Sequence, residues 1–158
     1  MITVESVWKR ELIRLANKLQ KRYEQKRWTI LSEAALEKEV FIGTFAVRKL
    51  LDSNKVSQKL LGKKFRATFY PARNRDEIKE SIKHFSHRFD LMHGTPQELT
   101  MRKLMEQFIH SYHFSPFVPI GKNMVGIFVA SDWKRKEGLY YVMLKRLIEI
   151  FREVGDEA

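Results

Sequence analysis

MVGIFVASDWKRKEGLYYVM, residues 124–143, is the stretch that decides the fold class. Its two apolar runs, Met124–Ala130 and Leu139–Met143, are short and rich in β-branched and aromatic residues, which is typical of strands. The polar segment between them, residues 131–138, ends in a glycine, as connecting loops often do. The pattern predicts a β-hairpin. Beyond it, apolar residues at helical spacing predict a terminal helix, through Leu147, Ile148, Phe151 and Val154.

The first half of the chain has the spacing of helices. One helix is predicted over residues 3–27, with Thr3 as its N-cap, and a second over residues 30–53. The second is apolar on most sides, so we expect it to be the central buried helix. Gly43 in its middle disfavours a helix by about 1 kcal/mol against Ala, so we expect it to permit close packing against another backbone. A short helical turn is predicted over residues 57–61.

In the middle of the chain, the spacing of apolar residues changes several times between that of a strand and that of a helix. Lys64–Tyr70 alternates apolar and polar residues and predicts a half-buried strand, and residues 76–84 predict a short helix. The pattern of residues 87–94 fits either a strand or a helix. Thr95–Glu98, with the sequence TPQE, has the pattern of a capped helix start, since Pro occupies the first helical position and Glu stands three residues after Thr. That helix is predicted to run to about Tyr112, before a loop marked by prolines.

Length and composition limit the class of protein. A chain of 158 residues with 44% hydrophobic residues is typical of one domain with one core. The absence of cysteine excludes a disulfide framework and fits the cytoplasm. The charged N-terminus does not fit a signal peptide, and no apolar stretch reaches the roughly 18 residues of a membrane span. We therefore expect one cytoplasmic α+β domain over residues 1–158, with about five helices packed on a small antiparallel sheet of about three strands and no membrane association.

Positive charge is concentrated in the first half of the chain. Residues 1–75 hold 18 Lys and Arg against 7 Asp and Glu, whereas residues 76–158 hold 12 of each. Such a concentration favours a phosphate-bearing partner, either a nucleic acid (RNA or DNA) or an anionic membrane, although a solvated basic face that only aids solubility fits the composition equally. The predicted phosphate contacts lie on the first helix and around the first strand: Arg14, Lys18, Lys21, Arg22, Arg66 and Arg73.

Histidine spacing raises the question of a metal. Four of the five histidines form two HxxH pairs, His84 with His87 and His110 with His113. If each pair shared a helix face, its imidazoles could ligate zinc or iron, and His93 or an aspartate, Asp90, could complete the site. HxxH lacks the glutamate base of metalloproteases, and histidines also serve as core or stacking residues. We therefore expect no metal, and the absence of a Gly-rich phosphate loop leads us to expect no other cofactor.

Arg88 and His93 stand in the order Arg, four residues, His. In this pattern the chain resembles the HEPN ribonucleases, small helical domains whose motif is Arg, four to six residues, His. The resemblance implies that Arg88 stabilises a phosphate and that His93 transfers a proton as a ribose 2′-hydroxyl attacks, without a metal. The chain departs from the family at Phe89, where a polar residue is usual, and in its predicted hairpin. The competing interpretation pairs Arg88 with Asp90 or Glu80 and places His93 in a turn.

A second resemblance covers about residues 30–155. FIHSYHF at Phe108–Phe114, VASD at Val129–Asp132 and LYY followed by an apolar helix resemble a group of uncharacterised bacterial proteins associated with mobile gene cassettes and genomic islands. The resemblance implies a bacterial accessory protein, and its distinctive polar positions are His110, Ser111, Tyr112 and Asp132. The alternative is that His110 and Tyr112 join the helix to the hairpin through buried hydrogen bonds.

These observations favour a nucleic-acid-interacting accessory protein over an enzyme. Three aromatic residues near the basic positions, Trp28, Phe69 and Tyr70, would stack on bases, and their alternative role is core packing, favoured more for Phe69 than for Tyr70. Two other classes stay open. One is a metal-independent ribonuclease built on Arg88 and His93, or around His110. The other is a protein-interaction or small-ligand module, in which the N-terminal helix would pair two copies of the chain.

Overall fold

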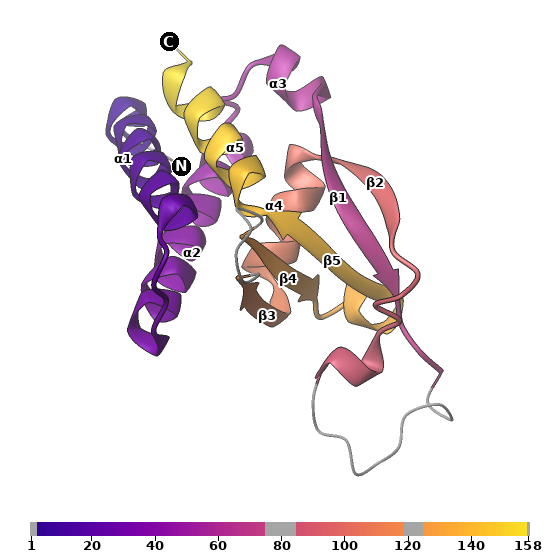
Figure 1. The fold of residues 1–158 in the computed structure, drawn as a ribbon. Coiled ribbons are helices and arrows are strands. Elements are labelled where there is room, and N and C mark those ends of the chain that lie inside the picture. The colour runs from indigo at the N-terminus through magenta and orange to yellow at the C-terminus, as the bar shows by residue number, and fades with distance from the viewer. Residues whose placement is uncertain (1–2, 75–84, 119–124, 158) are drawn as a thin grey trace.

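The computed structural model describes residues 3–74, 85–118 and 125–157, which form an α+β fold (Figure 1). Its antiparallel sheet has the strand order β2-β1-β5-β4-β3. The strands are β1 (Lys64–Pro71), β2 (Thr95–Thr100), β3 (Ser111–Phe117), β4 (Gly126–Ser131) and β5 (Gly138–Met143). The predicted fold class, C-terminal hairpin and terminal helix are therefore confirmed. The predicted three strands become five, because β2 and β3 extend the sheet on both sides.

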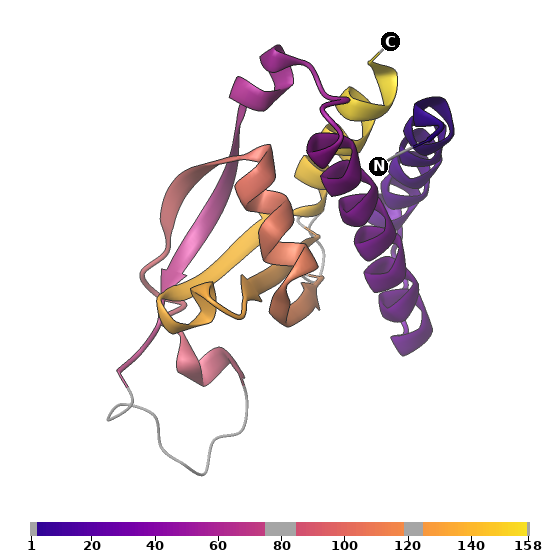
Figure 2. The ribbon, with the colours of Figure 1, turned by 180° about the vertical axis from the view of Figure 1, so that it is seen from behind.

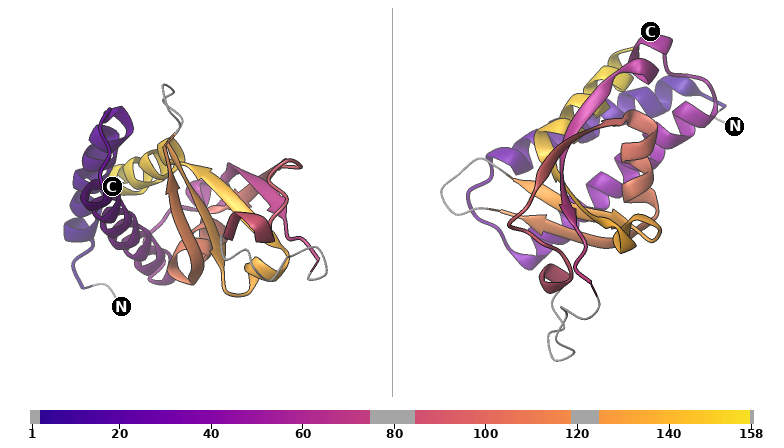
Figure 3. Two further views of the ribbon diagram at one scale, coloured as in Figure 1. Left: turned by 60° about the horizontal axis from the view of Figure 1, so that its bottom comes forward. Right: turned by 90° about the vertical axis from the view of Figure 1, so that its right-hand side faces the viewer.

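Five α-helices accompany the sheet within the described residues: α1 (Glu5–Glu24), α2 (Ile30–Asp52), α3 (Gln58–Gly62), α4 (Met101–Ile109) and α5 (Leu144–Asp156). Helix α4 lies against one face of the sheet, as the view from behind shows (Figure 2). Helix α5 continues from β5 and packs along α1. Figure 3 shows α1 and α2 gathered at one end of the molecule, with β1 and β2 at the other. The helix predicted over residues 76–84 lies outside the described residues.

The main core lies between the sheet and the helices, and a second, smaller buried cluster consists of Phe89, Ala130 and Leu139. The apolar stripe of α1, including Leu12, Leu15 and Leu19, is buried, and α1 packs against α5 and α2. Ile127, Val129 and Val142 of the sheet are also fully buried, on the face that α4 covers. Within the described residues, none of the helices is both long enough and apolar enough to cross a membrane.

The ends and packing of the two long helices differ partly from the prediction. The N-cap of α1 is Val4, which forms no side-chain hydrogen bond, so the predicted Thr3 cap is wrong. Helix α2 begins at Ile30, as predicted. Thr29 is its N-cap and forms a reciprocal capping box. Gly43 does permit close packing, but against the ring of Phe151 on α5 and not against a backbone, since a Cβ at Gly43 would lie 2.1 Å from two ring carbons.

The predicted helix start at Thr95–Glu98 is wrong, because these residues form part of strand β2. Residues 95–100 pair with β1 in an antiparallel register in which Phe65 faces Leu99. The proline at position 96 is compatible with this role because β2 is an edge strand, where a missing N–H removes no necessary hydrogen bond. The helix begins later, at Met101, where the side chain of Thr100 accepts a hydrogen bond from Lys103 N at 3.2 Å.

The predicted helix through Tyr112 also ends earlier than expected. Helix α4 ends at Ile109, His110 is its C-cap, and residues 111–117 form strand β3 against β4. The segment contains three aromatic residues, which favour strands, and β3 is the other edge strand, so it tolerates a proline at position 116. The correction moves His113 from a helix to the sheet.

Candidate nucleic-acid interface

Four aromatic side chains form a continuous cluster on the sheet face opposite α4. We refer to Tyr70, Phe117, Phe128 and Tyr141 as the aromatic face. The ring of Phe128 lies 4.9 Å from that of Tyr141, 5.7 Å from that of Phe117 and 6.1 Å from that of Tyr70, between centroids. Among the described residues no α-helix lies over this face, which is turned toward the viewer in Figure 1. Part of it is covered by Phe89, which is buried against Ala130 and Leu139, and Phe128 packs against these residues. The cluster therefore presents ring surface contributed by four strands.

The alternation of each strand separates this face from the core. Tyr140 is buried beneath α4, and its hydroxyl donates to the Gln97 side chain at 3.1 Å, whereas Tyr141 points to the opposite face. Phe69 and Tyr70 divide in the same way, with Phe69 against Tyr140 at 5.2 Å. Phe69 therefore packs against the core, which is the alternative that the sequence favoured more for Phe69 than for Tyr70, and the base-stacking role of Tyr70 stays a prediction.

A glycine permits the rings to lie close to the sheet. A Cβ at Gly126 would lie 2.4 Å from Cζ of Tyr141, so the Tyr141 ring occupies the space that a side chain on β4 would fill. Aromatic rings placed over a strand glycine in this way cover the exposed backbone. Burial of the Tyr141 hydroxyl raises its pKa to about 12, with smaller contributions from Tyr70 and Tyr23. Tyr141 therefore stays neutral at physiological pH and presents an uncharged ring.

Basic residues flank the aromatic face at two ends. On β1, Lys64 and Arg66 share the face of Tyr70 and are exposed. At the other end, Arg73 follows β1, and its backbone N–H donates to the carbonyl of Arg88 at 2.8 Å. The side chains of Arg66 and Arg73 are both exposed. Aromatic rings between positive charges are the combination by which proteins hold single-stranded nucleic acid.

The basic residues predicted on α1 do not join this surface. Helix α1 lies at the end of the molecule away from β1 (Figure 3). The Arg22 guanidinium pairs with Glu39 of α2 at 3.2 Å, and the Arg14 guanidinium pairs with Glu11, so these two cations are already engaged. Lys18 and Lys21 are exposed. The predicted basic surface is therefore divided into one part on α1 and another, with Arg66 and Arg73, beside the sheet. Trp28 packs against the core, and its indole N–H donates to Gln25 O at 3.1 Å.

Among the described residues, the histidines do not gather into a group that could hold a metal. His84 lies outside the described residues, and His110 and His113 occupy a helix cap and a strand, so the expectation that they share a helix face is wrong. No group of three potential His, Asp or Glu ligands occurs in the parts of the chain that are described. The imidazole of His110 instead lies 4.9 Å from the exposed ring of Trp133, at the turn of the β4–β5 hairpin.

Arg88 and His93 lie on separate turns near the end of β1. His93 Nδ1 lies 2.7 Å from Asp90 Oδ2, and this hydrogen bond lowers the pKa of the Asp90 carboxyl. The His93 side chain is 78% exposed. In the described part of the chain, no hydrogen bond or ion pair joins Arg88 to Asp90 or to His93. Asp90 therefore binds His93 and not Arg88. The ribonuclease role implied by the HEPN resemblance stays a prediction.

The polar positions of FIHSYHF and VASD do meet at the hairpin. The backbone N–H of Asp132 donates to His110 O at 3.0 Å, and its carboxylate accepts from Arg135 Nε at 3.0 Å. The Arg135 guanidinium also lies 4.0 Å from the ring centroid of Tyr112. His110 and Tyr112 therefore do contact the hairpin, but through exposed ring and cation contacts and not through the buried side-chain hydrogen bonds of the alternative interpretation.

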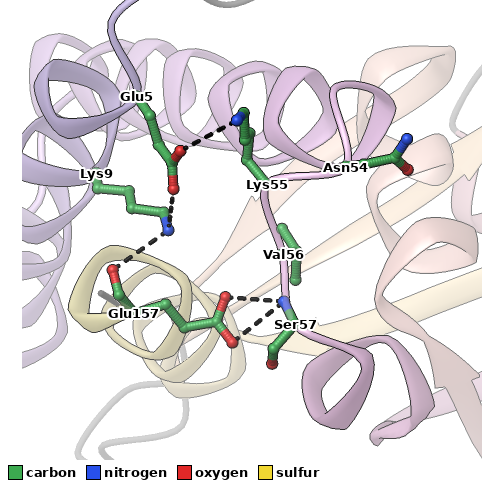
Figure 4. A pocket seen from close by; sticks show the side chains of 7 residues that line it. All are labelled: Glu5, Lys9, Asn54, Lys55, Val56, Ser57 and Glu157. Carbon is green, nitrogen blue, oxygen red and sulfur yellow. Dashed lines mark hydrogen bonds and ion pairs between the residues drawn. The ribbon is translucent and has the colours of Figure 1, made fainter.

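An open cavity of about 430 Å³ lies elsewhere, between the start of α1, the loop after α2 and the C-terminal residues (Figure 4). Its charged groups satisfy one another. Lys9 Nζ lies 2.6 Å from Glu5 and donates to Glu157 O at 3.2 Å, while the Glu157 carboxylate accepts from Ser57 N at 3.0 Å. These contacts join the two ends of the chain, so we assign this cavity a structural role.

Comparison of the chain with protein-family models, curated proteins and solved structures finds no match. The two resemblances drawn from the sequence therefore stay predictions. The aromatic face is the feature that sequence reasoning missed: of its four members only Tyr70 was expected at a binding surface. A signal existed in the LYY run of β5, because adjacent tyrosines on a strand must point to opposite faces.

Proposed function

We propose that this protein binds single-stranded nucleic acid across the aromatic face of its sheet. The observation that carries the proposal is the contact between the rings of Phe117, Phe128 and Tyr141, flanked by Arg66 and Arg73. Every base has a ring surface, so such a platform accepts bases with little sequence preference, and the flanking cations attract the phosphates. A duplex hides the faces of its bases, so a single strand fits this surface better.

The net charge of +11 supports the same proposal. A phosphate backbone benefits from cations that are not already paired, and Arg66 and Arg73 form no ion pair within the described residues. Neutral Tyr141 adds to this support, because a tyrosinate would repel phosphate. Arg14 and Arg22 play a smaller part in the proposal than the sequence suggested, since each is held by a carboxylate, Glu11 and Glu39 respectively.

Binding is tested with a fluorescein-labelled twelve-nucleotide single strand, as RNA and as DNA, by anisotropy in EDTA. If Lys64, Arg66 and Arg73 each contact a phosphate, affinity falls about 20-fold between 50 and 200 mM salt, from a slope of about −0.7 per contact. Duplex of the same sequence is expected to bind more weakly than either single strand. Affinity that is independent of salt, or preference for the duplex, contradicts the proposal.

The chain offers a matched pair of phenylalanines for testing the platform. Phe117 on the aromatic face is 45% exposed, and Phe45 on α2 is 47% exposed, so the two differ in location more than in accessibility. Phe117→Leu is expected to weaken strand binding about tenfold, on the scale of one lost base stack, whereas Phe45→Leu leaves it unchanged. Equal effects of the two substitutions rule out the aromatic face as the binding surface.

The same samples separate the other functional classes. Gel analysis of the RNA after incubation in EDTA reports cleavage, and loss of cleavage in His93→Ala or His110→Ala would identify the ribonuclease alternative. Mass measurement in solution reports self-association. Dimers that Phe117→Leu dissociates, with no binding of either strand, would make the aromatic face a protein interface and overturn the proposal.

A further inference from the structure

The turn between β4 and β5 holds a tryptophan on the surface. The side chain of Trp133 is 68% exposed. The backbone on both sides of it is fixed: Asp132 N donates to His110 O at 3.0 Å before it. After it, Lys134 N donates to Ser131 Oγ at 3.1 Å. The His110 imidazole also lies against the indole, with ring centroids 4.9 Å apart. The indole is therefore both open to a ligand and held in place, so ordering it on binding costs little entropy.

A second exposed ring lies beside the same turn. Tyr112 is 55% exposed, and the Arg135 guanidinium lies 4.0 Å from its ring centroid. The Asp132 carboxylate holds Arg135 there, because it accepts a hydrogen bond from Arg135 Nε at 3.0 Å. Arg135 is thus engaged by a carboxylate, and its role is to position the Tyr112 ring. Trp133 and Tyr112, which we call the turn pair, are two accessible rings at one turn.

Ring contacts connect the turn pair to the aromatic face. The Tyr112 ring lies 4.9 Å from that of His113, and the His113 ring lies 5.5 Å from that of Phe89, between centroids. Phe89 belongs to the small buried cluster against which Phe128 of the aromatic face packs. Tyr112 and Phe117 stand at opposite ends of β3, a distance of about 17 Å at the rise of an extended strand. A stacked nucleic-acid strand advances about 3.4 Å per nucleotide, so about five nucleotides cover this distance.

The charge of the turn indicates which ligand the turn pair fits. Lys134 pairs with Glu137 at 2.7 Å. Arg135 pairs with Asp132 at 3.0 Å, which leaves Lys136 as the cation of this turn without an ion pair among the described residues. A turn with so little net charge attracts neither phosphate nor an anionic membrane strongly, and membrane-binding segments present more apolar surface than one indole. The turn offers ring surface, and unpaired nucleobases stack on such rings.

We propose that the turn pair is a second stacking site for unpaired nucleobases. This inference rests on the proposed function, because the same single strand would occupy both sites, with bases stacked at each end of β3. Once the strand is bound at one site, its effective concentration at the other is high, so the two sites together bind more tightly than either does. The turn pair contributes stacking and not charge, so its part of the affinity is independent of salt.

The test uses the tryptophan emission of the full chain and a twelve-nucleotide single strand. Trp8 and Trp28 pack against the core, so the emission that Trp133→Leu removes comes from the exposed indole. The strand is expected to quench that emission by stacking. Trp133→Leu and Tyr112→Leu are each expected to weaken strand binding about tenfold, on the scale of one lost base stack, with an unchanged salt slope. Trp133→Phe keeps a ring and should retain most of the affinity.

Lys136→Gln, in the same turn, is the matched control, and it should weaken strand binding less than Trp133→Leu does. Equal losses in these two variants, or a weaker salt dependence in Trp133→Leu, would make the turn a phosphate contact and overturn the stacking site. If phosphatidylserine vesicles shift the Trp133 emission to shorter wavelength and the strand does not quench it, the turn binds a membrane and the stacking site is overturned as well.

The variants also separate this proposal from the proposed function. Strand binding that Phe117→Leu weakens and Trp133→Leu does not, without quenching of the exposed indole, overturns the stacking site alone. Strand binding that Trp133→Leu weakens and Phe117→Leu does not preserves the stacking site and overturns the aromatic face as the main binding surface.

Discussion

Replacement of Gly43 by alanine tests how the two buried helices of the core fit together. A Cβ at this position would lie 2.1 Å from Cε2 and Cζ of Phe151, against 3.4 Å for an ordinary van der Waals contact. The ring would therefore have to retreat by about 1.3 Å. Phe151 is 0% exposed, so its ring has no solvent to move into, and helices α2 and α5 must separate or the ring must leave its preferred rotamer.

Two opposing effects determine the size of the change. Overpacking a core costs about 1–3 kcal/mol, and the upper end applies here because two ring carbons clash at once. Alanine favours a helix over glycine by about 1 kcal/mol. We expect Gly43→Ala to lower the free energy of unfolding by about 2 kcal/mol, which for a chain of this size lowers Tm by about 4–8 °C.

Urea and thermal unfolding measure this change against Gly62→Ala as a control. Gly62 also lies in a helix, α3, but a Cβ there meets no atom within 4 Å, so this substitution is expected to leave stability unchanged or raise it slightly. In a Phe151→Leu background the effect of Gly43→Ala should shrink by at least about 1 kcal/mol. If Gly43→Ala instead stabilises the protein as much as Gly62→Ala, the packing of α2 on α5 through this glycine is refuted.

Three further predictions address the N-cap of α4, the ion pair of Arg22 on α1 and the buried hydroxyl of Tyr141 on the aromatic face. Thr100→Ala should cost about 1 kcal/mol in urea unfolding because Thr100 caps α4, and an equal loss in Thr95→Ala would favour the helix start expected from the sequence. Arg22→Gln should destabilise the protein by about 1 kcal/mol, since it breaks a half-buried pair between helices, whereas Lys21→Gln should leave the urea midpoint unchanged. The pKa of Tyr141, raised to about 12, is above its unfolded value near 10, so its contribution to stability is complete below pH 10 and is lost as the pH rises toward 12. Tyr141→Phe should reduce the fall in urea midpoint between pH 9 and pH 11, and an unchanged fall would show that the hydroxyl is not buried.

Local patterns predicted the elements whose formation depends on their own residues. The hairpin of β4 and β5 follows from two short apolar runs around a polar turn. Helices α1 and α2 follow from apolar spacing over more than five turns each. At residues 95–100 the local pattern failed, because a helix cap and an edge strand can share the same residues. There the pairing of Leu99 with Phe65, more than thirty residues away in the chain, decided the structure.

For the candidate site too, the sequence could predict some residues but not others. Arg66 and Tyr70 could be expected at a surface because the alternation of β1 places them opposite Phe65 and Ala67. Phe128 could not, because β4 is apolar on both faces and alternation carries no information there. The face of the sheet on which His113 lies depends on a bulge in β3, where Ser111 faces Ser131 and His113 faces Ala130.

The amino-acid sequence by itself determined that this protein has mixed helices and strands, a C-terminal hairpin with a terminal helix, and a surplus of positive charge in its first half. These properties depend on composition and on contacts within a few residues. Only the tertiary structure decided which cations pair with carboxylates, which face of the sheet α4 leaves uncovered and which aromatic rings meet there. The physical reason is that these arrangements depend on pairing between distant segments, and a shift of one residue in a strand register would turn each ring to the opposite face.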